Sequence, residues 1–165
     1  MVSTLNRALL LLLCLTGLQS MVLADQLDDS LSPRRQVDLD LNWKYPGDPE
    51  RLSDSEFNTV TAVARNLETR LDTSAYVGSE ARIFLELPIL VRGLGNPSSL
   101  VLSWTTGGLF NPGRITPGNR QLIYEGSITQ PVMRDTITFT FELDARFLYQ
   151  TLRVEPEYEI EIISP

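Results

Sequence analysis

The chain has 165 residues, of which 14 are basic and 21 acidic, and its formal net charge is −7. It contains no histidine, which excludes the commonest general base and metal ligand and every Ser–His or Cys–His nucleophile. The acidic balance argues against a nucleic-acid partner, because phosphates are bound by lysine and arginine.

The first 24 residues have the order of a secretory signal. Arg7 supplies a basic start, an apolar run follows over residues 8–15, and residues 22–24 provide a cleavage site. The apolar run is much shorter than the ~20 residues needed to span a bilayer. The sequence therefore predicts that residues 1–24 are removed and that no membrane span remains. The protein is expected to be exported to the periplasm or the cell exterior.

Cleavage after Ala24 would also remove the single cysteine, Cys14, and leave about 140 residues, enough for one domain. A domain of that size can be stable without a disulfide. Loss of Arg7 would change the net charge from −7 to −8. The alternative, lipidation at Cys14, is disfavoured because Leu13, the preceding residue, is not small.

The mature chain is predicted to begin with a leader and an amphipathic strand. Residues 25–36 are polar and interrupted by Pro33, so we expect a flexible leader. The single domain would then span residues 37–165. Its first strand is predicted from apolar residues that alternate with polar ones, a period typical of a half-buried strand. These apolar residues are Val37, Leu39, Leu41 and Trp43.

Residues 53–73 fit two structures. Ser53 and Glu56 have the spacing of a capping box, which favours a short helix within residues 53–66. Several β-branched residues between 59 and 63 oppose a helix, because they lose side-chain freedom in one. We therefore expect the second half of this stretch to be extended.

The remaining chain has the pattern of an all-β protein. Strands are predicted at residues 81–87, 100–104, 121–125, 136–142, 151–154 and 158–163. Turn signals recur every ~8–12 residues, as in a sandwich or barrel. We predict an immunoglobulin-like β-sandwich of about seven to nine strands. Its interior is predicted to hold Trp43, Ile83, Leu85, Leu102, Trp104, Ile137, Phe139 and Phe141.

A long loop with two Pro-Gly turns separates two of these strands, over residues 105–120. Long loops on a rigid sheet often carry binding residues. The candidate binding residues in and beside this loop are Trp104, Phe110, Arg114, Asn119 and Arg120. The alternative is that Trp104 belongs to the core and the loop is a simple connection.

Carboxylates are the remaining side chains that can take part in catalysis or metal binding. Asp38 and Asp40 share one strand face, as do Glu157, Glu159 and Glu161. Such groups can hydrolyse glycosides or bind Ca²⁺, although exposed strands carry acids for protection as well. No nucleophile, phosphate-loop or thiol motif accompanies them. The sequence therefore predicts no enzyme activity, no metal centre and no cofactor.

Three functions remain open on these grounds. The first is a binding or interaction module for another exported protein or a glycan. The second is a structural subunit whose strand adds to the sheet of another copy by β-augmentation. The residues that would carry this exchange are Val37, Leu39, Leu41 and Trp43. The third is an acid-type hydrolytic or Ca²⁺-dependent module that uses the carboxylates.

Overall fold

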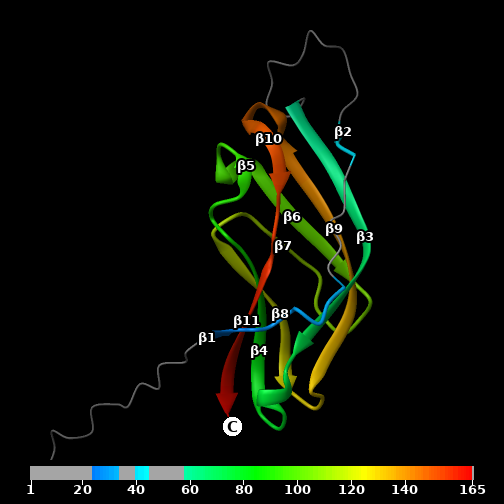
Figure 1. Ribbon diagram of the computed structural model, residues 1–165, viewed down its shortest axis with the longest axis vertical. Helices are drawn as coiled ribbons and strands as arrows, with labels where there is room; N and C mark the ends of the chain where they lie inside the picture. Colours follow the sequence, from blue (N-terminus) through cyan, green and yellow to red (C-terminus); the bar gives the residue numbers. More distant parts are fainter. Residues whose placement is uncertain (1–23, 34–39, 45–57, 165) are drawn as a thin grey trace, which may run out of the picture.

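The computed structural model describes residues 24–33, 40–44 and 58–164 (Figure 1). Strands make up 62% of it and no helix reaches seven residues, so the all-β prediction is confirmed. The strands are β1 (Ala24–Gln26), β2 (Asn42–Trp43), β3 (Thr59–Asp72), β4 (Glu80–Leu87), β5 (Arg92–Leu94), β6 (Leu100–Thr106), β7 (Gly113–Ile115), β8 (Asn119–Ser127), β9 (Val132–Asp144), β10 (Leu148–Arg153) and β11 (Glu157–Ser164).

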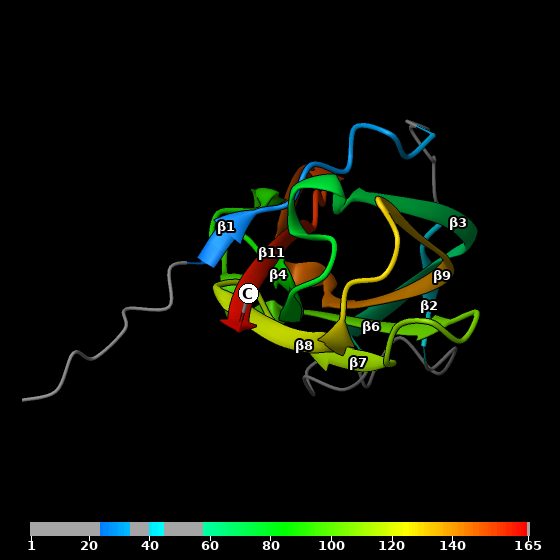
Figure 2. The same cartoon turned by 90° about the horizontal axis from the view of Figure 1, so that it is seen from below.

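These strands form two main sheets and a small ribbon. One sheet has the order β1-β11-β4-β8, the other has the order β2-β3-β9-β6-β7, and β10 pairs with β5. All pairings are antiparallel. Figure 2 shows the two sheets facing each other, which is a sandwich-like arrangement. The strand number exceeds the predicted seven to nine, because three-residue strands such as β5 and β7 are too short to show alternation.

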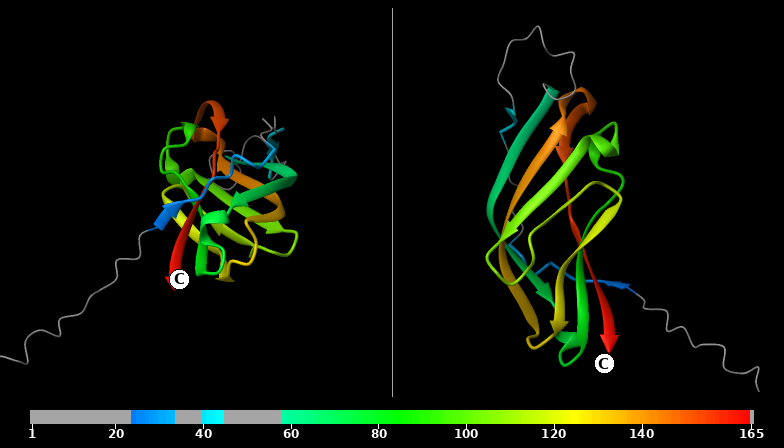
Figure 3. Two further views of the ribbon diagram at one scale, coloured as in Figure 1. Left: turned by 60° about the horizontal axis from the view of Figure 1, so that its bottom comes forward. Right: turned by 180° about the vertical axis from the view of Figure 1, so that it is seen from behind.

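The long strand β3 resolves the ambiguity of residues 53–73. Residues 59–72 are extended, so the expected helix is wrong from residue 59 onward, and residues 53–57 lie outside the described part. Figure 3 shows β3 and β9 side by side along most of their length. Their register shifts between Ala64 and Leu67, where Asn66 has a positive φ of 54°. This bulge changes the buried positions from even to odd residue numbers.

One hydrophobic core lies between the sheets and holds all but one of the predicted interior residues. Alternation on β4 and β9 places one face of each strand in this core, as a period of two requires. The confirmed interior residues are Ile83, Leu85, Leu102, Trp104, Ile137, Phe139 and Phe141.

The prediction for Trp43 is wrong. Trp43 is 52% exposed and Leu41 is 44% exposed. Only Asn42 and Trp43 pair with β3, at the outer edge of the five-stranded sheet. Among the described residues, no second layer covers the side chains at that edge, so alternation does not lead to burial. Val37 and Leu39 lie outside the described residues.

The first part of the predicted leader belongs to the fold. Residues 24–26 pair with β11, and Leu27 is 4% exposed within the core. Residues 25–33 are therefore not a free leader, although their composition is polar. One buried leucine, backbone hydrogen bonds and the Ser32 hydroxyl hold this segment against the sheets.

Candidate functional site

The aromatic residues of the predicted loop site are buried. Trp104 is 3% exposed and Phe110 is 2% exposed. The indole N–H of Trp104 donates to the carbonyl oxygen of Asn111 at 3.0 Å. Neither ring can therefore be part of an exposed binding patch, and the alternative in which Trp104 is a core residue is the correct one.

Asp135, on β9, organises this loop from the neighbouring strand. Its Oδ2 accepts from the backbone N–H groups of Leu109 and Phe110 at 2.9 and 2.8 Å. Its Oδ1 accepts from the N–H groups of Gly107 and Thr136 at 2.9 and 2.7 Å. One carboxylate thus satisfies four backbone donors, which turns the loop inward and places Phe110 in the core.

Replacing Asp135 with alanine is expected to release this loop. The expected cost is about 1.5–3 kcal/mol, because hydrogen bonds to a charged acceptor are lost and the freed donors must find water. Urea unfolding followed by tryptophan fluorescence measures the cost, since Trp104 lies against the loop. Asp135→Asn should keep part of the stability. An unchanged unfolding midpoint in Asp135→Ala would contradict this role.

The polar residues of the predicted site are exposed but do not gather around the aromatic ones. Arg114 lies on β7 of the five-stranded sheet, opposite Ser103. Asn119 begins β8 and donates from Nδ2 to Thr116 Oγ1 at 2.9 Å. Arg120 lies on the four-stranded sheet. The five residues are divided between the core and two sheets, so the structure does not assemble them into one patch.

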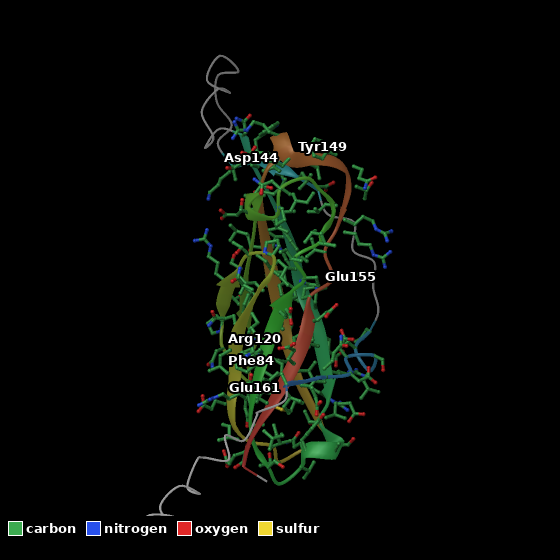
Figure 4. All side chains as sticks on the ribbon, turned by 90° about the vertical axis from the view of Figure 1, so that its left-hand side faces the viewer. Phe84, Arg120, Asp144, Tyr149, Glu155 and Glu161 are labelled. Atoms are coloured by element: carbon green, nitrogen blue, oxygen red, sulfur yellow. The ribbon has the colours of Figure 1, made fainter. Side chains whose placement is uncertain are left out.

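Arg120 belongs instead to a charged face of the four-stranded sheet. Its guanidinium donates to Glu159 Oε2 at 2.9 Å and to Glu161 Oε1 at 2.7 Å. The same guanidinium lies over the ring of Phe84, 4.2 Å from its centroid (Figure 4). The two carboxylates therefore have a counter-ion within the sheet.

Glu86 lies on the same face, opposite Arg120 and Glu157, and has a raised pKa. Burial and a hydrogen bond with Glu159 raise the pKa of Glu86, and the nearby charge of Glu157 adds to the effect. Within the described residues, no group of three acidic side chains is arranged to hold a metal ion. Asp40 is exposed, and Asp38 lies outside the described part. The face has the features of a solvated ion-pair network more than those of a catalytic pair.

A different surface has the exposure that a binding site needs. Ile89 and Leu90 follow the end of β4 and are 61% and 85% exposed. Pro88 cannot donate to the sheet, so the strand ends there and the next two apolar residues lie outside it. Large apolar side chains with this exposure are common at interaction sites when they occur together.

These residues border a cleft with a volume of about 360 Å³. We call the cleft and its exposed border the end surface; it is formed by Ile89, Leu90, Val91, Arg92, Leu94, Gly95, Pro97 and Tyr149. Tyr149 is 74% exposed and its ring lies on Gly95, where any side chain would overlap the ring. The absence of a side chain at Gly95 therefore allows the aromatic ring to extend the apolar surface.

The end surface also carries positive charge in an acidic protein. Arg92 is exposed, and in the described part of the chain it has no ion-pair partner. Directly opposite it on β10 lies Arg153, which pairs with Glu155 at 2.6 Å. Glu155 offsets the charge of Arg153, which leaves the exposed Arg92 guanidinium, among the described residues, as the unpaired charge beside the cleft.

Sequence reasoning did not identify the end surface. The strand predicted at residues 81–87 ends before this pair, but nothing in the local pattern distinguishes an exposed Ile89-Leu90 pair from a buried one. Tyr149 and Gly95 come together only because β10 pairs with β5, more than fifty positions apart in the chain.

Comparison with known proteins found no match to any family model, curated protein or solved structure. In the described residues, no helix is long and apolar enough to cross a membrane.

Proposed function

We propose that this chain is an exported, non-enzymatic interaction module that binds another exported protein through the end surface. The observation that carries the proposal is the exposure of Leu90, Tyr149 and Ile89 around a cleft. Three large apolar side chains in contact with water do not stabilise a monomer, whereas an interface buries them. The order of the first 24 residues supports export.

The chemistry of the end surface suggests the kind of partner. Its cleft accepts an apolar side chain, Tyr149 offers a rigid aromatic contact, and Arg92 offers a cation to a carboxylate. We therefore propose a protein partner that presents an apolar residue beside an acidic one. A glycan ligand would also contact the aromatic ring of Tyr149, but it would contact the apolar side chain of Leu90 less favourably.

We also propose that the two main sheets form an immunoglobulin-like sandwich. The support is the way in which the chain passes between them. β3 lies in the five-stranded sheet and β4 in the four-stranded one. Later in the chain, β8 and β11 lie in the four-stranded sheet, and β9 between them lies in the five-stranded sheet. Crossings of this kind are typical of Greek-key sandwiches.

The test compares two aspartate substitutions. Leu90→Asp charges the end surface, whereas Val77→Asp charges a residue that is 50% exposed at the opposite end of β4. Each protein is used to isolate partners by cross-linking in extracts of the export compartment. The dissociation constant of the purified partner is then measured by calorimetry. Leu90→Asp should weaken binding about tenfold or more, as expected of a buried interface anchor, and Val77→Asp should not.

Equal binding by both variants would contradict the assignment to the end surface. A glycan-array signal that depends on Tyr149, with no protein partner, would show that the ligand is a carbohydrate instead. Turnover of a glycoside substrate by the wild-type chain would contradict the non-enzymatic role.

A further inference from the structure

Residues 24–33, which we call the strap, close the open side between the two sheets. The strap starts as β1 on the edge of β11 and then crosses to the outer edge of β3 (Figure 2). It therefore contacts one edge of each main sheet. The place that it occupies, which we call the seat, is formed by the edges of β11 and β3 and the core between them.

One apolar side chain of the strap is buried in the seat. Leu27 is 4% exposed and belongs to the core, and its backbone N–H donates to the carbonyl oxygen of Tyr158 on β11 at 2.8 Å. On either side of Leu27, the strap residues Asp25, Asp28 and Ser30 are exposed. The strap is thus held by one anchor side chain with polar neighbours.

The β3 side of the seat recognises backbone and hydroxyl groups. The N–H of Asp72 donates to the carbonyl oxygen of Asp28 at 2.9 Å. The N–H of Arg70 donates to Ser32 Oγ at 2.7 Å, and the Ser32 hydroxyl donates to the Arg70 carbonyl oxygen at 3.1 Å. Ser32 therefore satisfies both backbone groups of one edge residue, as a neighbouring strand would.

Release of the strap disturbs the fold less than release of a central strand. β9 is hydrogen-bonded to β3 on one side and β6 on the other, and β4 is likewise bonded to β11 and β8. Releasing either strand would break two ladders, whereas releasing the strap breaks a three-residue ladder, a few further bonds and the Leu27 contact. The empty seat would then expose the apolar core around Leu27 and two unpaired strand edges.

We propose that the strap is exchanged between copies of this chain, so that the strap of one molecule occupies the seat of another. A second copy carries the same leucine, the same serine and the same backbone groups at the same spacing. Every contact is then identical in the closed monomer and in the exchanged assembly, and protein concentration decides between them. This exchange uses residues 24–33, not residues 37–43.

Cysteine pairs test the exchange in the exported chain, which keeps residues 25–33 of the strap after cleavage behind Ala24; Cys14→Ser in every variant excludes a thiol from uncleaved precursor. Gln26 on β1 and Glu159 on β11 are directly opposite, a separation that suits a disulfide. One preparation carries only Gln26→Cys and another only Glu159→Cys; the two are mixed at high concentration and oxidised. The matched control mixes Ser103→Cys and Thr140→Cys, which are opposite on β6 and β9.

Exchange predicts a mixed dimer linked between positions 26 and 159, identified by mass spectrometry, at about ten times the yield of the control mixture. Adding Leu27→Asp to the Gln26→Cys chain should abolish this dimer, because the anchor no longer enters the seat. Two results would overturn the proposal. One is a mixture that stays monomeric while the double variant Gln26→Cys/Glu159→Cys forms its internal bond. The other is an equal yield of dimers in both mixtures.

Discussion

Replacing Phe139 with alanine is expected to lower the free energy of unfolding by about 3–5 kcal/mol, the usual cost of removing a buried phenylalanine. Phe139 lies on the central strand β9, directly between Ala64 on β3 and Trp104 on β6, and is 5% exposed. The ring of Phe141 lies 6.4 Å from it, centroid to centroid. With ladders on both sides, the strand cannot move inward to fill the cavity.

Urea unfolding monitored by circular dichroism measures this cost. Leu90→Ala is the matched control, since Leu90 is 85% exposed and its removal should change stability by less than about 0.5 kcal/mol. A cost below about 1 kcal/mol for Phe139→Ala would mean that this face of β9 is not the core.

Alkaline pH is expected to destabilise the protein through Tyr158. Burial raises the pKa of Tyr158 to about 12, and a hydrogen bond with Thr69 opposes this only in part. In the unfolded chain the pKa of tyrosine is ~10. Between these values the folded protein holds a proton that the unfolded chain releases. The stabilisation is therefore complete below pH ~10 and is lost as the pH rises to ~12, by about 2–3 kcal/mol.

The measurement is the free energy of unfolding in urea from about pH 9 to pH 12, for the wild type and for Tyr158→Phe. The variant has no phenol at this position and should lose much less stability over the same range. Burial and Asp25 also raise the pKa of Tyr76, so a smaller decline should remain in the variant. Identical curves for both proteins would contradict a buried, protonated Tyr158.

The two proposed interactions use separate parts of the molecule. The end surface is built on the β4–β5 connection and on β10, whereas the seat of the strap lies between β11 and β3. Leu90→Asp should therefore leave strap exchange intact, and Leu27→Asp should leave the end surface unchanged. The two tests can fail independently.

The sequence alone determined the strands whose alternation is regular. β4 and β9 were predicted with the correct inward residues, because a period of two is a local property that any covering layer preserves. The absence of histidine and of catalytic motifs was likewise established from the sequence alone. These features depend on residues close together in the chain.

The tertiary structure decided everything that depends on what covers a residue. Trp43 alternates as regularly as Phe139, but it lies on an uncovered edge and is 52% exposed. Phe110 is buried because Asp135, which is 25 positions away, binds the backbone of its loop. Leu27 is buried because the strap that carries it crosses from the edge of β11 to the edge of β3. Alternation records that a strand has two faces, and only long-range pairing decides which face is shielded from water.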